Sequence, residues 1–283
     1  MSSPCQKNEK RLLFALKTLQ KTVSLHSTSG KVINGEIAAH KRLISFHREH
    51  IVRLLATYTH QRKVHLVFPW ADGTLAEFWA IHYPKPEQIS RDHNFAKWMI
   101  DQVLGLADAL LCIHIHTAKS SLEGLSPEDS RKLHGRHGDL KPENILWFRS
   151  TSSTSETVSL GTLKLSDLGS AEFHGTRSHV LAASAAGGYT NTYYAPEYDL
   201  AEEVSSEADL WSFGCILIQL IVWYMKGWDG LDDFSKRRAE DSLSEIKMDN
   251  FFNYLKYEKE VRAKKSVYEV WSFHPWLRDV GLC

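Results

Sequence analysis

The chain has 283 residues, of which 43% are apolar and 24% charged, the balance of a globular protein with material for a sizeable core. Its 34 basic and 34 acidic residues cancel, so no overall field favours nucleic acid or a membrane surface as a partner. Four scattered cysteines give neither a disulfide framework nor a zinc site, and residues 1–11 are too polar for a signal peptide. We therefore expect an intracellular protein, cytoplasmic or nuclear, without a membrane span.

The first part of the chain predicts a small unit that mixes strands with one helix. An apolar run at 12–18 predicts a strand that ends near a lysine, although its length alone also allows a helix. A short helix is expected at 34–45. Two more strands follow at 54–59 and 64–68, separated by the polar turn at 60–63.

Beyond residue 69 the apolar pattern becomes helical. Apolar side chains recur at spacings of three and four and predict one long core helix: Phe95, Trp98, Met99, Val103, Leu106, Leu110 and Ile113. The polar stretch 119–136 contains Gly and Pro and predicts a surface insertion. The Ser/Thr-rich stretch 150–159 predicts a loop between strands at 145–148 and 163–165.

The most informative segment runs from His137 to Asn144 (HGDLKPEN). It resembles the catalytic loop of eukaryotic protein kinases, which implies that Asp139 accepts the proton of the acceptor hydroxyl. The same resemblance implies that Lys141 lies near the transferred phosphate, that Asn144 binds a metal ion, and that His137 has a structural role. Phosphoryl transfer depends mainly on positioning and charge neutralisation, so these residue types occur together. A solvated turn is the alternative, and the eight-residue match disfavours it.

Two further segments follow in the order of that family. A predicted strand runs into Asp167-Leu-Gly169, which resembles the magnesium-binding Asp-Phe-Gly motif and implies that Asp167 binds the metal. Alone it would be an ordinary turn, but its place 28 residues after Asp139 (167 minus 139) favours the motif. The Ala-Pro-Glu that ends at Glu197 resembles the end of a kinase activation segment.

Two polar residues near that segment complete the C-terminal resemblance. Thr190 lies where serine/threonine kinases keep a threonine that contacts the catalytic Asp and Lys, which together with Lys141 favours Ser or Thr as acceptors. Asp209 begins Asp-Leu-Trp-Ser-Phe-Gly, which is similar to the start of the buried helix that anchors the catalytic loop. Asp209 would then cap backbone amides of that loop; the alternative is an exposed residue on an amphipathic helix.

The N-terminal elements fit the same template. Phe-Ala-Leu-Lys17 resembles the Val-Ala-Ile-Lys strand, which implies that Lys17 binds the α- and β-phosphates of a nucleotide and pairs with Glu36. Either residue alone would more commonly be solvated. Phe68 to Ala71 occupies the position of the hinge, where backbone groups at Phe68 and Ala71 would hold adenine.

The resemblance covers about 12–228, is similar to fungal protein-kinase domains, and implies an α+β fold with two lobes. We expect a truncated, strand-rich N-lobe at 1–68, a hinge at 69–73 and a mainly helical C-lobe at 74–283 with an incomplete end. The implied activity is transfer of the ATP γ-phosphate to a Ser or Thr hydroxyl of a protein substrate, with ATP and Mg2+ as cofactors. We expect a monomer without nucleic-acid or membrane partners.

The sequence departs from the family at several positions. No Gly-x-Gly occurs, and with 16 residues before Lys17 two strands and a phosphate-covering turn do not fit. Gly138 replaces an Arg that commonly pairs with an activation-loop phosphate, which disfavours control by phosphorylation. Acceptors are nevertheless present: Thr176, Ser178, Ser184 and Thr192. His40 occupies an aliphatic position and is interpreted as a satisfied core histidine, and Arg278 is a candidate partner for Glu197.

Two other functions remain open. A non-enzymatic, kinase-like binding or regulatory module would agree with the absent glycine loop. A small-molecule phosphotransferase of the aminoglycoside or choline kinase type would also use His-Gly-Asp with an Asn five residues after the Asp. The Ala-Pro-Glu and Asp-x-Trp-Ser-x-Gly segments belong to protein kinases and place that alternative third.

Overall fold

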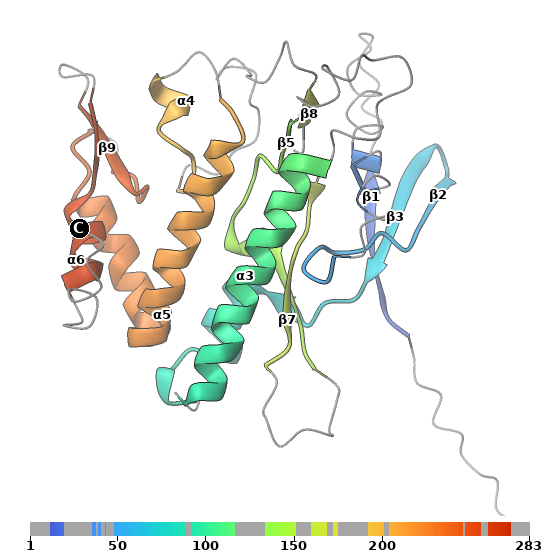
Figure 1. Ribbon diagram of the computed structural model, residues 1–283, viewed down its shortest axis with the longest axis horizontal. Coiled ribbons are helices and arrows are strands. Elements are labelled where there is room, and N and C mark those ends of the chain that lie inside the picture. Colours follow the sequence, from blue (N-terminus) through green and yellow to red (C-terminus); the bar gives the residue numbers. More distant parts are fainter. Residues whose placement is uncertain are drawn as a thin grey trace, which may run out of the picture.

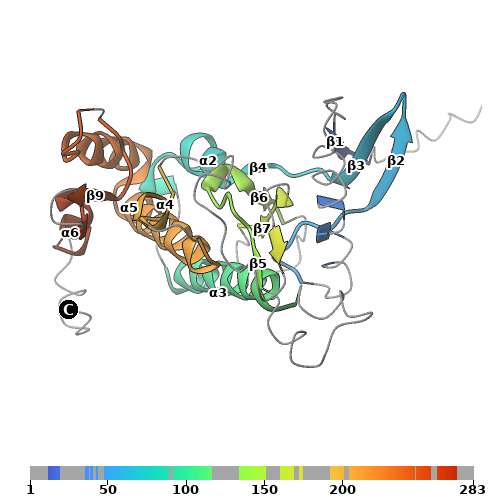
Figure 2. The same ribbon diagram turned by 90° about the horizontal axis from the view of Figure 1, so that it is seen from above.

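A strand-rich part and a helical part of the molecule lie side by side, and the long helix α3 (His93–His116) belongs to the helical part (Figures 1 and 2). The computed structural model describes residues 12–19, 36–37, 39–40, 43, 48–88, 92–116, 134–150, 160–168, 172–174, 192–200, 204–245, 247–255 and 260–272. The predicted α+β class is confirmed.

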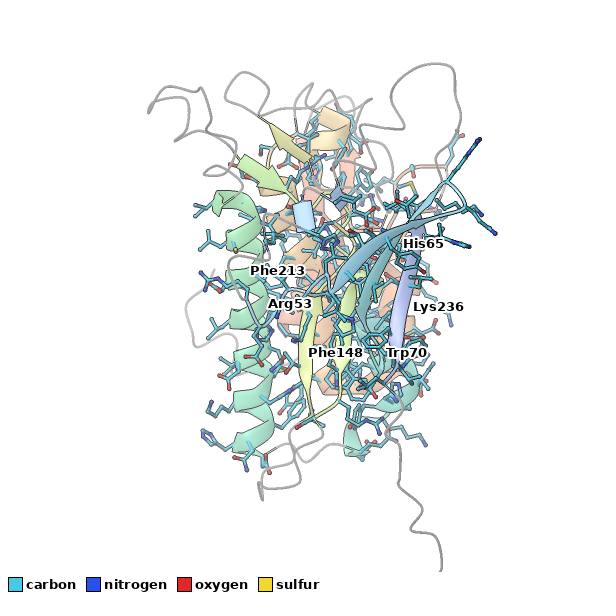
Figure 3. All side chains as sticks on the ribbon, turned by 90° about the vertical axis from the view of Figure 1, so that its right-hand side faces the viewer. Arg53, His65, Trp70, Phe148, Phe213 and Lys236 are labelled. Carbon is cyan, nitrogen blue, oxygen red and sulfur yellow. The ribbon has the colours of Figure 1, made fainter. Side chains whose placement is uncertain are left out.

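The strand-rich part is an antiparallel sheet of three strands: β1 (Phe14–Leu19), β2 (Ala56–His60) and β3 (Lys63–Pro69). Their order is β1-β3-β2, with Lys17 opposite Leu66. Gln61 and Arg62 join β2 to β3 with positive φ angles of 47° and 62°, the geometry that matches the twist of a tight hairpin. The three predicted strands are thus confirmed with slightly shifted bounds, and Figure 3 shows their side chains, with His65 on β3.

A second sheet connects the two parts. Its order is β4 (Gly73–Thr74), β6 (Ile145–Phe148) and β7 (Thr162–Leu165). The chain continues from β4 into three short helical turns: α2 (Leu75–Glu77), η1 (Phe78–His82) and η2 (Pro86–Gln88). Thr74 caps α2, because its hydroxyl accepts a hydrogen bond from the Glu77 amide.

Two long helices form the centre of the helical part. The Asp92 carboxylate caps α3 by accepting a hydrogen bond from the Phe95 amide at 2.9 Å, and the predicted apolar stripe faces the core. Helix α5 spans Glu207–Glu240 and bends at Gly227, whose φ of 70° only glycine adopts easily. By length and composition alone both helices could cross a membrane, a property that core helices of soluble proteins share.

The remaining described elements are short. They are β5 (His134–Arg136), η4 (Pro142–Asn144), β8 (Glu172–His174), α4 (Glu197–Leu200), β9 (Phe252–Leu255), β10 (Glu260–Ala263) and α6 (Lys265–Ser272). Strands β9 and β10 form an antiparallel hairpin. The sequence predicted a mainly helical C-lobe and did not indicate these two strands, because they are too short to show a clear period of two.

Backbone hydrogen bonds tie the segment before β2 to the second sheet. The Val52 amide donates to the Leu165 carbonyl at 2.9 Å, and the Leu165 amide donates to the His50 carbonyl at 2.8 Å. The described residues between 36 and 43 that precede this segment are helical. The segment around His50 and Val52 is therefore hydrogen-bonded to the end of β7, which leads directly into Asp167.

Candidate active site

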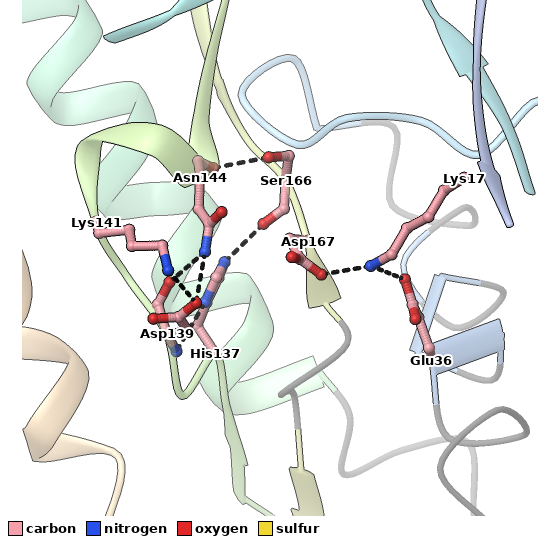
Figure 4. Close-up of polar contacts among 8 residues, drawn as sticks. All are labelled: Lys17, Glu36, His137, Asp139, Lys141, Asn144, Ser166 and Asp167. Carbon is pink, nitrogen blue, oxygen red and sulfur yellow. Dashed lines mark hydrogen bonds and ion pairs between the residues drawn. The ribbon is translucent and has the colours of Figure 1, made fainter. Parts of the chain in front are cut away.

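The segment between β5 and β6 brings three polar side chains together (Figure 4). Asn144 Nδ2 donates to the Asp139 backbone oxygen at 2.7 Å and to Asp139 Oδ2 at 3.0 Å. Lys141 Nζ lies 2.8 Å from the same Asp139 Oδ2. Because the amide nitrogen of Asn144 faces Asp139, its Oδ1 is the atom suited to bind a cation.

His137 fastens this loop to the end of β7. It is fully buried, and its Nε2 lies 2.9 Å from the Ser166 carbonyl oxygen, while the Asp139 amide donates to His137 Nδ1 at 3.4 Å. The Ser166 amide and hydroxyl both donate to the Asn144 carbonyl at 2.9 Å. The loop and the residue before Asp167 therefore form one hydrogen-bonded unit.

Asp209, at the start of α5, holds the same loop through hydrogen bonds. Its carboxylate accepts hydrogen bonds from the backbone amides of His137 at 2.7 Å and Gly138 at 3.0 Å. The carboxylate also lies 2.9 Å from His114 Nε2. Burial alone would raise the pKa of this carboxyl, but the hydrogen bond with His114 and the nearby His137 outweigh burial, so the pKa is lowered. The structure places Asp209 on the loop amides, where the sequence predicted it. His114 gave no such signal, because its partner is 95 residues away.

Lys17 contacts two carboxylates from distant parts of the chain. Its Nζ donates to Glu36 Oε1 at 2.8 Å and to Asp167 Oδ1 at 2.6 Å (Figure 4). Burial would lower the pKa of Lys17, but the bonds with Asp167 and Glu36 together outweigh it and raise the pKa. Asp167 has a φ of 55°, a left-handed conformation that costs a non-glycine residue roughly 1 kcal/mol. Strain of this kind occurs most often at functional sites.

These groups surround a cavity of about 420 Å³. Its lining includes the predicted hinge residues from Phe68 to Ala71, together with Lys17, Asp167 and Asn144. The volume lies within the range of small-molecule sites. Trp70, which follows the end of β3 and also lines the cavity, is 58% exposed (Figure 3).

The side chains around the cavity fit a nucleotide with magnesium. The Asp167 carboxylate and Asn144 Oδ1 are the oxygen ligands that magnesium prefers, and the Lys17 ammonium suits phosphate oxygens. Within the described ranges, no three His, Cys, Asp or Glu side chains converge as a metal site of their own. Magnesium bound here would therefore need the nucleotide phosphates as further ligands, as is common for this ion.

His40 lies at the back of the same cavity and is only 3% exposed. Its ring centroid is 5.1 Å from that of Phe68, and in the part of the chain that the structure describes its Nε2 has no hydrogen-bond partner. Burial, followed by the charge of Lys17, lowers the pKa of His40 to about 4. The sequence interpretation of His40 as a core histidine is therefore confirmed. The expectation that its polar atoms are satisfied is wrong for Nε2.

Some predicted residues cannot be placed. Those outside the described residues are Gly169, Thr176, Ser178, Ser184, Thr190 and Arg278. Glu197 begins α4, and among the described residues its buried Oε2 has no hydrogen-bond partner, so pairing with an arginine stays a prediction. Thr192, named above as a phosphate acceptor, donates its hydroxyl hydrogen to Asp249 Oδ1 at 2.7 Å. The sequence gave no indication of this contact.

The family model described as "Protein kinase domain" matches residues 2–268. The chain belongs to the protein kinase family. The match is longer at both ends than the 12–228 that the motifs indicated, so the C-terminal part of this kinase domain resembles the family better than its sequence suggested.

Named relatives agree with this family at modest identity. The chain is 28% identical over 218 residues to 3-phosphoinositide-dependent protein kinase B of Dictyostelium discoideum, which is 75% of this chain and 19% of that protein. It is 26% identical over 227 residues to cyclin-dependent kinase 7 of the same organism, covering 79% and 52% of the two chains. Serine/threonine-protein kinase nekl-2 of Caenorhabditis elegans is 41% identical over 85 residues, 30% of this chain and 20% of that one. The matched region thus spans about half or less of each relative.

Proposed function

We propose that this kinase domain transfers the γ-phosphate of ATP to a Ser or Thr hydroxyl of a protein substrate. The observation that carries the proposal is a cavity lined by Lys17, Glu36, Asp167 and Asn144, with Asn144 linking it to a second polar cluster. Lys17 bonds to both Glu36 and Asp167, and Asp139 bonds to both Lys141 and Asn144. These are the groups that phosphoryl transfer requires for positioning and charge neutralisation.

Asp139 is the proposed base. Asn144 and Lys141 both contact its Oδ2, so the carboxylate has a fixed orientation from which it can accept the proton of an incoming hydroxyl. The Lys141 ammonium lies beside the same oxygen and can neutralise negative charge on the transferred group. Asp209 and His137 orient this loop through buried hydrogen bonds and do not themselves need to touch the substrate.

ATP with Mg2+, when bound, supplies the phosphoryl group and a cation that neutralises its charge. In this chain, Asn144 Oδ1 and Asp167 would bind the cation, and Lys17 would bind phosphate oxygens. Backbone groups at Phe68 and Ala71 would hold the adenine. The preference for Ser or Thr acceptors is supported by Lys141 and by the similarity to nekl-2, a serine/threonine-protein kinase. Action inside the cell as a monomer remains part of the same proposal.

A second candidate is a kinase-like module that binds partners without transferring phosphate. The sequence contains no Gly-x-Gly, and within the described residues β1 is an edge strand of its sheet. Backbone donors that would cover the phosphates are therefore not supplied by the described part of the N-terminal sheet. This candidate predicts a folded protein that transfers no phosphate.

Two measurements separate these functions. A ligand at 100 times its Kd stabilises a protein by about 2.7 kcal/mol, so ATP with Mg2+ should raise the Tm of the wild-type chain by several degrees. Lys17→Met should abolish most of that shift. Labelled phosphate should then appear on Ser/Thr peptides and not on aminoglycosides or choline. A Tm shift with ATP but without phosphate transfer would favour the binding module. Labelled phosphate on a small alcohol would favour the small-molecule phosphotransferase.

A further inference from the structure

The carboxylate of Asp249 joins the end of the activation segment to the far half of α5. Its Oδ1 accepts the hydroxyl hydrogen of Thr192 at 2.7 Å, across 57 residues of sequence. Its Oδ2 accepts the hydroxyl hydrogen of Ser235 at 2.9 Å. Ser235 lies beyond the bend at Gly227, so this contact reaches a part of α5 separate from the part that begins at Asp209.

Arg238 fixes Asp249 in this place. The side chain is 0% exposed, and its guanidinium lies over the rings of both Phe234 and Phe251, at 4.1 Å and 4.2 Å from their centroids. Its Nε donates to the Asp249 carbonyl oxygen at 2.7 Å, and one terminal nitrogen lies 3.7 Å from Asp249 Oδ2. Burial lowers the pKa of Arg238 to about 10, so it stays charged at neutral pH. A buried cation requires a nearby anion, and Asp249 provides it.

The residues next to Thr192 lie beside the proposed catalytic loop. Tyr193 and Tyr194 line a narrow crevice together with Gly138 and Asp139. The Tyr193 carbonyl accepts the Ser212 hydroxyl at 2.7 Å, and its own hydroxyl donates to Gln219 at 3.0 Å. Both of these contacts reach the near half of α5. The contact of Thr192 with Asp249 is therefore a second, separate attachment of the same segment.

We propose that Asp249, held by Arg238 and Ser235, is a positioning residue that anchors the end of the activation segment through Thr192. The anchor fixes the backbone that carries Tyr193 and Tyr194, and so the surface on which a substrate chain meets Asp139. The effect on substrate use rests on the proposed kinase function, whereas the anchor itself does not. Loss of the anchor should therefore weaken acceptor binding and leave ATP binding intact.

The test compares four variants with the wild-type chain. Thr192→Val keeps the shape and removes the hydroxyl, and Asp249→Asn keeps the shape and removes the charge. Thr192→Ser restores the donor. Thr162→Val is the matched control, because the hydroxyl of Thr162, on β7, makes only a long 3.5 Å contact with the exposed Glu49 among the described residues. For each variant, amide hydrogen exchange at 192–200, Tm, and the KM values for a Ser/Thr peptide and for ATP are measured.

Thr192→Val and Asp249→Asn should speed exchange at 192–200 by about tenfold, the factor expected for the loss of one net hydrogen bond. Both should raise the peptide KM several-fold with the ATP KM unchanged, whereas Thr192→Ser and Thr162→Val should match wild type. A purely structural role would lower Tm and the active fraction without separating the two KM values. Unchanged exchange in Thr192→Val, or faster exchange with an unchanged peptide KM, would overturn the proposal.

The outcomes also separate this proposal from the proposed function. If the wild-type chain transfers no phosphate, the kinase function fails, and the exchange comparison alone decides whether the anchor exists. If Asp249→Asn does not fold, Thr192→Val decides, because it changes a half-buried hydroxyl and leaves the Arg238 pair in place.

Discussion

The buried imidazole of His40 should make the stability of this kinase domain depend on pH below neutrality. Its pKa is about 4 in the folded chain, against an ordinary value of 6.5. Between these values the unfolded chain binds a proton that the folded chain does not, so the free energy of unfolding rises with pH. The stabilisation is complete above about pH 6.5 and is lost as the pH falls toward 4. From pH 8 to pH 5 the loss amounts to about 2 kcal/mol.

Replacing His40 by Leu removes the titrating group and leaves an apolar side chain against Phe68. Urea unfolding at pH 8 and pH 5 gives the change in unfolding free energy for each chain, and wild type should lose about 2 kcal/mol more than His40→Leu. His93→Leu is the matched control, because His93 is an exposed histidine at the start of α3, and it should behave as wild type. Equal losses in wild type and His40→Leu would refute the reasoning.

Three other predictions concern Asp209, Lys17 and a pair of glycines. Asp209→Ala should lower the unfolding free energy in urea by about 3 kcal/mol, because it leaves two loop amides and His114 without their buried acceptor; a change below 1 kcal/mol would contradict this. Lys17→Met should weaken ATP binding at least about tenfold in calorimetry, because the ammonium is lost from the phosphate side of the cavity; an equal Kd would contradict that role. Gly105→Ala should cost about 1–3 kcal/mol, since a Cβ there would lie 2.1 Å from His50 Nε2, whereas Gly214→Ala, with nothing within 4 Å, should be neutral or stabilising.

The features that sequence could predict are those written in short, ordered segments. The catalytic loop and the Asp-Leu-Gly turn each carry their residues within eight positions, so Asp139, Asn144 and Asp167 could be named directly. The long helix α3 was predictable because its apolar stripe persists over many turns. Strand bounds moved by one or two residues, since the ends of strands are set by their neighbours and not by composition.

The features that sequence missed depend on contacts between distant residues. His114 meets Asp209 across 95 residues, and Thr192 meets Asp249 across 57, with no periodicity or motif that pairs them. Arg238 is fully buried against two aromatic rings, although an arginine in a charged stretch of helix predicts an exposed side chain. Such pairs are fixed by tertiary packing, and local pattern does not encode them.

The most direct measurement compares phosphate transfer to a Ser/Thr peptide by wild type and Asp139→Asn, at saturating ATP and Mg2+. A general base contributes about 10²- to 10⁴-fold, so Asp139→Asn should transfer phosphate at least about a hundredfold more slowly. Its Tm shift with ATP and Mg2+ should equal that of wild type, because the cavity side with Lys17 and Asp167 is unchanged. Equal transfer rates in the two chains, or no transfer by a wild-type chain that binds ATP, would contradict the proposed function.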